Sequence, residues 1–373
     1  MKERAYNFGA GPAMLPTEVL LRAQEELLDW NGTGVSVMEI GHRTSNFQDM
    51  LTKLEVKLRG LMNIPDNYKI LFLQGGAQGL FNLIPMNLLG KNKDVDYLVS
   101  GVWSERAAKY AKKYANVNIV TTATKDSIPD FSTWNLNKNA AYAYYCPNET
   151  INGMRFPSIP DTGNVPLIAD MTSSILSEEI DVSKFGLIFA SAQKNLGIAG
   201  VTLVIVREDL LTVDAANGVP EVYIPEVFIP EVFNFKTQIE QKSCLNTPPT
   251  FAIYMMDLMV DWSIKQGGVK QLELDTRVKS QKLYQYISQS QGFYTNPVAV
   301  HYRSLINIPF SLADNDNQLL ELFLSEAAKH DLKYLKGHIL VGGARASLYN
   351  AMPLSGVDAL IEFMRDFAAK HRC

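Results

Sequence analysis

Two kinds of hydrophobic pattern alternate along most of the chain. Short apolar runs are typical of buried strands, and they occupy residues 69–73, 95–100, 118–121, 141–145, 166–169, 187–190 and 202–206. Around them, apolar positions recur at helical spacing, which predicts helices over 17–28, 47–62, 80–89, 104–114 and 251–265. Strands that alternate with helices build βαβ units. The pattern therefore predicts an α/β fold with a mostly parallel sheet.

The last third of the chain has a different pattern. Only short strands are predicted there, among helices, at 306–310 and 346–348, with helices over 269–290, 318–330 and 357–371. This mixture is typical of an α+β domain. We place the change of domain near Asp261. We expect a large α/β domain over 16–260 and a smaller α+β domain over 261–373, with residues 1–15 packing on the smaller one.

A glycine-rich turn follows the first predicted strand. The sequence Gln74-Gly75-Gly76-Ala77-Gln78-Gly79 leads directly into a predicted helix. Such a turn exposes backbone N–H groups at a helix N-terminus, which suits a phosphate. Its spacing matches neither the dinucleotide-binding fingerprint nor a P-loop. Glycines also allow close packing of helix on strand, so the turn alone does not identify a ligand.

Lys194 lies between two predicted buried strands, at 187–190 and 202–206. The polar segment Ser191-Ala192-Gln193-Lys194-Asn195 separates them. Desolvation makes a lysine amine nucleophilic, as Schiff-base chemistry with a carbonyl or with pyridoxal phosphate requires. The alternative is a solvated, inert lysine at a strand exit, and this segment taken alone favours that alternative.

Asp170 changes that balance. It directly follows the apolar run 166–169, so we expect it at the carboxyl end of a strand, where open α/β sheets bind ligands. An acid there can pair with a protonated pyridine nitrogen while a lysine on the next strand holds the aldehyde. Asp170 could instead cap a turn. Taken together, Asp170 and Lys194 indicate a pyridoxal-phosphate enzyme.

Three more side chains are candidates for the same site. Trp103 follows the strand that ends at Ser100 and could stack on a flat cofactor ring, although it could equally belong to the core. Thr150 follows the strand at 141–145 and could place a hydroxyl in the same crevice. Arg345, in the predicted smaller domain, could bind a carboxylate through two hydrogen bonds or form a surface ion pair.

Composition narrows the functional classes. Of the 373 residues, 47% are hydrophobic, enough for a large core and too many for a disordered chain. The net charge of −4 gives no sign of binding to nucleic acid or to an anionic membrane. Apolar runs are too short to cross a bilayer, and residues 1–16 lack the apolar core of a signal peptide. Cys146, Cys244 and Cys373 lack metal-like spacing. We expect a reduced, cytoplasmic protein that binds no metal.

Residues 219–233 contain three tandem pentads, Val-Pro-Glu-Val-Tyr, Ile-Pro-Glu-Val-Phe and Ile-Pro-Glu-Val-Phe. Three five-residue repeats are too short for a solenoid. Regularly spaced prolines disfavour both a helix and a central strand. We expect an extended surface segment, and we assign it no chemistry.

Segments spread over nearly the whole chain match one family in order. They are FGAGPAMLP at 8–16, GHRTSNF at 41–47, FLQGGAQG at 72–79, GVWSERA at 101–107, CPNETINGMRF at 146–156, ADMTSS at 169–174, ASAQKNLGIAGVT at 190–202, LNTPPTFAIY at 245–254 and VGGARASLYNAMP at 341–353. On these segments the chain resembles the phosphoserine aminotransferases. The resemblance implies a pyridoxal-phosphate-dependent transferase of fold type I, with a mostly parallel seven-stranded sheet in its large domain.

The resemblance also implies the role of each cofactor-binding residue. Lys194 would be the Schiff-base lysine and would move the α-proton of the substrate, and Asp170 would keep the pyridine nitrogen protonated. Trp103 would stack on the ring, and Thr150 would bond the ring hydroxyl. The cofactor phosphate would be bound by Ala77, Gln78 and Gln193, together with Asn246 and Thr247 of the other subunit. A homodimer with shared active sites is therefore expected.

The resemblance further implies the substrate contacts. Arg345 would bind the α-carboxylate, and His42, Arg43 and His338 would meet the distal phosphate or γ-carboxylate. Two positions depart from the family pattern. Ile339 stands where the family usually has an arginine, which removes one cation from the expected substrate-phosphate pocket, and Gln78 stands where many members have an arginine.

The implied reaction is reversible transamination of 3-phosphooxypyruvate with glutamate in serine biosynthesis, giving phosphoserine and 2-oxoglutarate. A second implied substrate is 3-hydroxy-2-oxo-4-phosphooxybutanoate, of pyridoxine biosynthesis. A cysteine desulfurase of the same fold is an alternative, but those enzymes have a histidine before the lysine, where this chain has Gln193, and use a mobile cysteine. A non-catalytic or nucleotide-binding α/β protein would leave the pairing of Lys194 with Asp170 unexplained.

Overall fold

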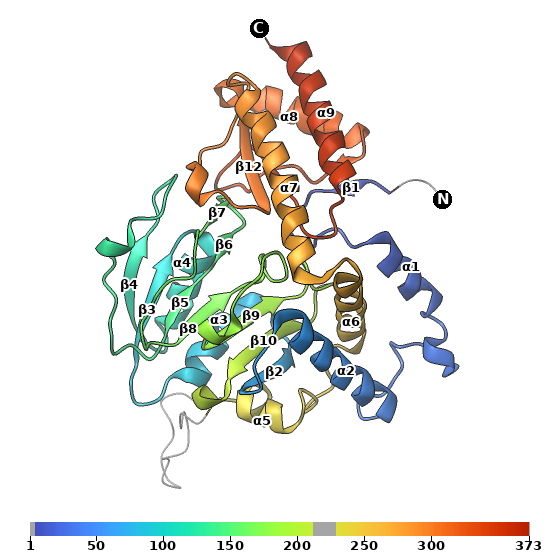
Figure 1. Ribbon diagram of the computed structural model, residues 1–373, viewed down its shortest axis with the longest axis vertical. Coiled ribbons are helices and arrows are strands. Elements are labelled where there is room, and N and C mark those ends of the chain that lie inside the picture. Colours follow the sequence, from blue (N-terminus) through green and yellow to red (C-terminus); the bar gives the residue numbers. More distant parts are fainter. Residues whose placement is uncertain (1–3, 212–228, 373) are drawn as a thin grey trace.

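The computed structural model describes residues 4–211 and 229–372, and a seven-stranded sheet is its central element (Figure 1). The strand order is β2-β10-β9-β8-β5-β3-β4. Strand β10 is antiparallel to both of its neighbours, and the other strands run in one direction. This confirms the predicted mostly parallel sheet. Its strands are β2 (Tyr68–Leu73), β3 (Asp94–Val99), β4 (Asn116–Thr122), β5 (Ala143–Tyr145), β8 (Leu167–Asp170), β9 (Leu187–Ser191) and β10 (Thr202–Arg207).

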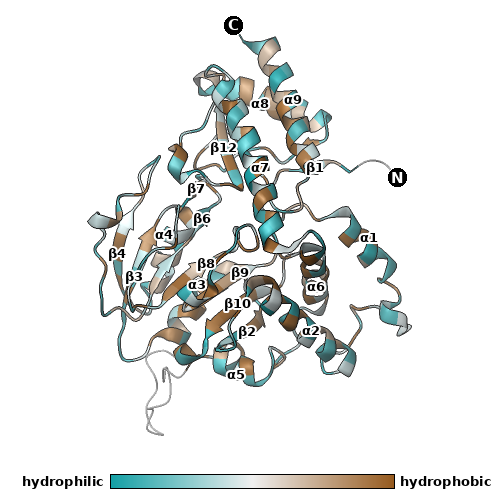
Figure 2. Ribbon diagram, viewed as in Figure 1, coloured by the Kyte–Doolittle hydropathy of each residue, from teal (hydrophilic) through white to brown (hydrophobic). Residues whose placement is uncertain are grey.

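Helices cover both faces of this sheet. One face packs against α2 and α6, and the opposite face packs against α3 and α4. Figure 2 shows the apolar residues gathered on the middle strands and on α6. The helices of this part are α1 (Thr17–Glu25), α2 (Ser45–Met62), α3 (Gly76–Leu88), α4 (Val102–Ala111), α5 (Phe235–Glu240) and α6 (Thr250–Lys265).

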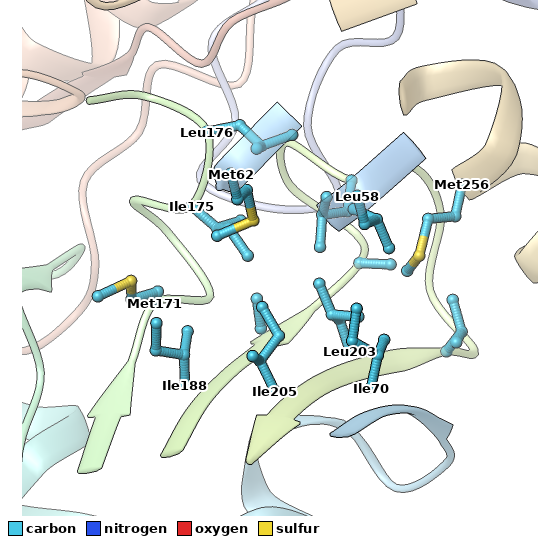
Figure 3. Close-up of a cluster of buried hydrophobic side chains, with 14 of the residues drawn as sticks. Leu58, Met62, Ile70, Met171, Ile175, Leu176, Ile188, Leu203, Ile205 and Met256 are labelled. Carbon is cyan, nitrogen blue, oxygen red and sulfur yellow. The ribbon is translucent and has the colours of Figure 1, made fainter. Parts of the chain in front are cut away.

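Alternate residues of the middle strands belong to different cores. In β10, Leu203 and Ile205 lie on the face that meets Leu58 and the rest of α2 (Figure 3). Val204 and Val206 lie on the other face. Side chains alternate along a strand, and helices on both faces bury both sets. This is why the strands appear in the sequence as uninterrupted apolar runs.

A second core lies in the C-terminal part. Phe8 belongs to it, and β1 (Tyr6–Asn7) pairs in parallel with β13 (Leu332–Lys333). Leu272 near the start of α7 packs in the first core, and Leu283 farther along α7 packs in the second, so α7 joins them. The domain boundary near Asp261 stays a prediction. The other elements here are α7 (Gly268–Gln289), α8 (Asn317–Lys329), α9 (Leu354–His371), β11 (Tyr294–Thr295), β12 (Asn307–Leu312) and β14 (Ala344–Ser347).

The prediction for α1 was wrong at both ends. The sequence predicts Thr17 as the N-cap residue, just before the first helical turn, of a helix that continues to Leu28. Thr17 is instead the first helical residue, and its hydroxyl accepts a hydrogen bond from Arg4 Nη1 at 2.9 Å. The helix ends at Glu25, and Leu28 is 85% exposed. Leu28 therefore does not extend the buried stripe of α1.

Three other expectations concern the tandem pentads, membrane-spanning helices and the cysteines. Of the tandem pentads, only residues 229–233 are described, where Glu231–Phe233 form a short 3-10 helix; the expectation for the remainder lies outside the described residues. Within 4–211 and 229–372, no helix combines the length and apolarity that a membrane span needs. In the same ranges, Cys146 and Cys244 are free thiols and both are buried.

Candidate active site

The carboxyl edge of the large sheet brings the two central candidates together. Asp170 is the last residue of β8, and Lys194 follows the end of β9 by three residues. The two strands are parallel neighbours. Asp170 is 4% exposed and Lys194 is 9% exposed. An acid and an amine therefore lie at adjacent strand ends, both largely removed from water.

Asp170 has an environment that suits a cationic partner. Burial raises the pKa of its carboxyl, while hydrogen bonds from Thr172 and the charge of Lys194 oppose that rise. The backbone N–H of Thr172 donates to Asp170 Oδ1 at 3.0 Å. A protonated pyridine nitrogen would oppose the effect of burial in the same direction as the lysine charge. The site therefore fits the ring of pyridoxal phosphate.

The N-terminal segment packs over Lys194. The sequence did not indicate this contact. A Cβ built on Gly11 would lie 3.4 Å from Lys194 Cε. The N–H of Ala13 donates to the carbonyl of Gln193 at 2.9 Å. At the residue after the lysine, Asn195 Oδ1 accepts from the N–H of Asn350 at 3.0 Å. Segments far apart in the sequence thus enclose the lysine and restrict water around it.

The glycine-rich turn after β2 has the geometry of a phosphate site. Gly76 has a φ of 64°, in the left-handed region that glycine adopts without strain. The N–H groups of Ala77 and Gln78 lie in the first turn of α3, where they have no partner within the helix. Ser191 Oγ donates to Gln193 Oε1 at 2.6 Å, which leaves the amide nitrogen of Gln193 as a donor. These groups can surround a cofactor phosphate.

Trp103, Thr150 and Arg345 meet at the same edge. The indole Nε1 of Trp103 donates to Thr150 Oγ1 at 3.0 Å, and the Thr150 hydroxyl keeps its own proton to donate. Arg345 lies in β14, and its Nη1 donates to the Thr150 carbonyl at 2.9 Å. Burial lowers the pKa of Arg345. A desolvated guanidinium favours an anionic partner, so Arg345 is suited to a substrate carboxylate.

Four more predicted ligands, His42, Arg43, Asn246 and Thr247, form a second group that we call the rim. Arg43, Asn246 and Thr247 are exposed. Burial raises the pKa of the Cys244 thiol, two residues before Asn246, and the positive charge of Arg43 offsets part of that rise. The carbonyl of Thr247 accepts from Gln74 Nε2 at 3.2 Å, at the start of the phosphate turn.

His42 belongs to the same rim. Its carbonyl accepts from Gln48 Nε2 at 2.7 Å, and the same amide lies 3.5 Å from Cys244 Sγ. The Nε2 of His42 is buried and finds no hydrogen-bond partner among the described residues. The rim therefore combines the exposed side chains of Arg43, Asn246 and Thr247 with a buried imidazole nitrogen of His42 that has no partner in the described part of the chain.

The loop before β14 carries the predicted departure from the family pattern. His338 is half-buried, and its Nδ1 accepts from the N–H of Leu340 at 3.3 Å. Ile339 is 93% exposed. Two other cations could replace the missing one: Lys336 pairs with Glu321 at 2.8 Å, and Arg303 donates through Nε to the carbonyl of Val298 at 2.9 Å.

Comparisons with known proteins decide the family. The model of the class-V aminotransferases matches residues 5–360. A phosphoserine aminotransferase of Acinetobacter baylyi is 50% identical over 372 residues, covering 99% of each chain. The solved phosphoserine aminotransferase of Bacillus circulans superposes with a TM-score of 0.92 at 41% identity, covering 99% of each chain. The chain belongs to the phosphoserine aminotransferase family.

A third comparison concerns the cofactor. The structure of a PLP-bound phosphoserine aminotransferase from Trichomonas vaginalis is similar at a TM-score of 0.90 and 38% identity, covering 97% of this chain and 100% of that one. Family membership confirms fold type I, pyridoxal phosphate as the cofactor and aminotransferase activity. It also excludes the alternative of a non-catalytic or nucleotide-binding α/β protein. Cys146 and Cys244 are both buried, which disfavours the mobile cysteine of a desulfurase.

Sequence reasoning missed several residues that shape this site. Gly11, Asn195 and Asn350 enclose Lys194, and Glu149 contacts the start of α4. The quoted segments contained all of them, but no spacing rule separates them from their neighbours. One usable signal was Glu149, an acid four residues after the predicted buried strand at 141–145 and directly before the candidate Thr150.

Proposed function

We propose that this chain catalyses the reversible transamination of 3-phosphooxypyruvate with glutamate, giving phosphoserine and 2-oxoglutarate. The observation that carries the proposal is the buried pair of Asp170 and Lys194 at adjacent strand ends. A relative named phosphoserine aminotransferase is 50% identical to this chain over 99% of its length. We also propose a cytoplasmic location and a second substrate, 3-hydroxy-2-oxo-4-phosphooxybutanoate.

The residues that would hold the cofactor are those at the sheet edge. Trp103 would stack on the ring, Thr150 would donate to the ring hydroxyl, and Asp170 would bind the ring nitrogen. The backbone of Ala77 and Gln78, with the amide of Gln193, would bind the phosphate. Pyridoxal phosphate supplies an aldehyde that takes up the amino group and a ring that spreads the charge left at the substrate Cα.

Lys194 would act twice. Its Nζ would hold the cofactor aldehyde and, when free, would take the proton from the substrate Cα as a general base. The cover formed by Gly11 and Ala13 restricts water around this amine. Exclusion of water favours the transfer of the proton between enzyme and substrate over its loss to solvent.

Substrate recognition would combine two groups of cations. Arg345 would bind the α-carboxylate while its Nη1 remains on the Thr150 carbonyl. His42, Arg43 and His338 would bind the distal phosphate or the γ-carboxylate of glutamate. Both substrates would use the same positions, because each carries one carboxylate next to the reacting carbon and one anion at the far end.

The position of the rim supports a homodimer. Arg43, Asn246 and Thr247 are exposed in the single chain, and Thr247 lies beside the start of the phosphate turn. In a two-fold dimer the same surface serves both chains. We propose that the rim of each chain completes the site of the other, so that His42 and Arg43 act across the interface together with Asn246 and Thr247.

Mixing two inactive variants should restore activity if the sites are shared. One partner carries Lys194→Ala, and the other carries Asn246→Ala with Thr247→Ala. In each heterodimer one site combines the intact lysine of one chain with the intact rim of the other. Random exchange gives half heterodimers with one intact site each, so about a quarter of wild-type activity should return. Failure to gain activity after verified subunit exchange would contradict shared sites.

Restoring a cation at position 339 should improve binding of phosphorylated substrates. A hydrogen bond to a charged group contributes about 1.5–3 kcal/mol, so Ile339→Arg should lower the KM for phosphoserine by about ten-fold. Lys336 and Arg303 are engaged with Glu321 and Val298, which supports the view that they do not supply the missing cation. Steady-state kinetics at low ionic strength would measure the effect.

Two controls define this prediction. The KM of Ile339→Arg for an amino donor without a distal anion, such as alanine, should not change. The gain for phosphoserine should shrink as salt rises, because screening weakens the added charge. An unchanged phosphoserine KM at low salt would place position 339 away from the substrate phosphate.

The function itself is tested by half-reactions. The holoenzyme should convert to its aminated cofactor form with phosphoserine alone, with a spectral change and release of one 3-phosphooxypyruvate per site. Subsequent addition of 2-oxoglutarate should restore the first spectrum and release glutamate. Conversion by serine as readily as by phosphoserine would count against the proposed substrate.

A further inference from the structure

Glu149 has a buried carboxylate for which the mechanism above has no use. It lies in β6 (Asn148–Glu149), which pairs with β7 (Met154–Arg155), and its exposed fraction is 0%. Its Oε1 accepts from the backbone N–H of Ser104 at 2.8 Å and from the Ser104 hydroxyl at 2.7 Å. Its Oε2 accepts from the N–H of Trp103 at 3.1 Å. Both oxygens therefore bind the first turn of α4.

This carboxylate takes the place of a capping side chain. Trp103 and Ser104 are the second and third residues of α4, whose N–H groups the helix itself leaves without partners. The residue at the N-cap position is Gly101, which has no side chain to offer. A residue from another strand, Glu149, satisfies the helix instead.

Gly101 is required by space and not by backbone conformation. Its φ of 177° is extended backbone that any residue adopts. A Cβ at this position would lie 2.7 Å from Glu149 Cδ, too close for a real contact. The absence of a side chain at 101 is what allows the carboxylate of Glu149 to approach the helix.

The groups around Glu149 are hydrogen-bond donors, which suit an ionised carboxylate. The Ser104 hydroxyl accepts from the N–H groups of Ser100 and Gly101, at 2.9 and 3.1 Å, so its own proton is available to Glu149. Three donors thus converge on the carboxylate, and the N-terminus of α4 adds a favourable dipole. Burial raises the pKa of Glu149 above its ordinary value, and the bonds from Ser104 and Trp103 offset part of that rise.

The groups that Glu149 binds carry the proposed cofactor contacts. Trp103 gives its backbone N–H to Glu149 and its indole N–H to Thr150, the next residue in the chain. Arg345 donates to the carbonyl of the same Thr150. One short segment therefore connects the proposed ring-stacking, ring-hydroxyl and carboxylate-binding groups.

We propose that Glu149 is a positioning residue, whose ionised carboxylate fixes the first turn of α4 so that the Trp103 ring and the Thr150 hydroxyl keep the spacing that pyridoxal phosphate requires. The proposal rests on the roles given above to Trp103 and Thr150. Its consequence is specific: loss of the carboxylate should alter how the cofactor is bound and not only how firmly the chain folds.

Glu149→Gln is the first test, because it keeps the side-chain volume and places an NH2 group against N–H donors. Titration of the apoprotein with pyridoxal phosphate should show a Kd about ten-fold higher than that of the wild type. The circular dichroism of the bound cofactor should weaken, because its ring is held less rigidly. An unchanged Kd together with an unchanged dichroism band would overturn the proposal.

Gly101→Ala tests the same contact without altering Glu149. The added Cβ should displace the carboxylate and raise the Kd in the same direction. In a Glu149→Ala background the atom with which the Cβ collides is gone, so Gly101→Ala should then have no further effect. An equal effect of Gly101→Ala in both backgrounds would contradict the proposal. Gly101→Ala by itself remains informative if Glu149→Gln fails to fold, because it leaves the carboxylate in the chain.

Asp96→Asn is a matched control for the loss of a buried carboxylate. Asp96 has an exposed fraction of 0% near the amino end of β3, away from the site, and accepts from Asn118 Nδ2 at 2.8 Å and from the N–H of Asn137 at 2.7 Å. This variant should lower the Tm of the apoprotein and leave the cofactor Kd unchanged. A similar rise in Kd for Asp96→Asn would mean that Glu149 acts only through general stability.

One further variant separates this proposal from the proposed function. If Trp103→Ala leaves the cofactor Kd unchanged, the stacking role of Trp103 is wrong. If Trp103→Ala raises the Kd while Glu149→Gln does not, the stacking role stands and the positioning role of Glu149 fails.

Discussion

Replacement of Lys194 by alanine should abolish transamination, with kcat/KM lower by about 10⁴-fold. The variant loses both the amine that holds the cofactor aldehyde and the base that moves the Cα proton, and proton transfer alone contributes about 10²–10⁴-fold. The phosphate turn and Asp170 are untouched. The variant should therefore still bind pyridoxal phosphate reversibly.

Borohydride treatment gives the decisive measurement. In the wild-type holoenzyme, reduction should leave the cofactor covalently attached to the peptide that contains Lys194. In Lys194→Ala no peptide should carry it. Attachment of the cofactor to a different lysine in the wild type would remove the central assignment of the site.

Lys279 provides a matched control, since it is the other buried lysine of the described residues. Its Nζ donates to the carbonyls of Tyr349 and Met352, at 2.9 and 3.0 Å, and burial lowers its pKa to about 8. Lys279→Met leaves buried carbonyls without a donor and should lower the Tm. Borohydride should still attach the cofactor to Lys194 in this variant. Burial alone would then not account for the labelling.

The sequence predicted the sheet well because its strands are buried on both faces. In β10 alternate residues face different cores, so nothing polar interrupts the run. A strand of this kind is recognisable without knowing its neighbours. The prediction for the end of α1 was wrong because apolar spacing there does not correspond to burial. Leu28 continues the apolar spacing but packs on no core, and the Thr17 hydroxyl is engaged by Arg4, which lies thirteen residues earlier.

Part of the site was predictable from the same rule. The carboxyl ends of parallel strands lie at one edge, so Asp170 and Lys194 could be placed together from sequence alone. The contacts that complete the site join segments with no local relation. Arg345 reaches the Thr150 carbonyl across 195 residues, and Gly11 packs on Lys194. Such contacts depend on how the two cores pack, which hydrophobic periodicity does not encode.

The departure at position 339 needed both kinds of information. The family resemblance implies that a cation is missing from the loop that contains His338. The structure adds that Ile339 is 93% exposed and that Lys336 is already paired with Glu321.

Replacement of Asp170 by asparagine should lower kcat by about 10³-fold with little loss of apoprotein stability. The side chain keeps its shape but loses the charge that would keep the ring nitrogen protonated. Breaking a buried charge pair costs about 3–5 kcal/mol, and each 1.36 kcal/mol is a factor of ten in rate. Stopped-flow measurement of the first half-reaction would give the effect on chemistry directly. A kcat close to that of the wild type would make Asp170 only a turn residue.

The apoprotein offers a second measurement that does not depend on activity. Burial raises the pKa of Asp170 in the folded chain above its ordinary value of 3.8. At a pH between 3.8 and this raised pKa, the folded state therefore binds more protons than the unfolded state. Stability then rises as the pH falls through the raised pKa, and the gain is complete below 3.8. Asp170→Asn cannot take up this proton. The Tm of wild-type apoprotein relative to the variant should therefore increase on acidification, and a constant difference would show that the carboxyl is not desolvated in the folded chain.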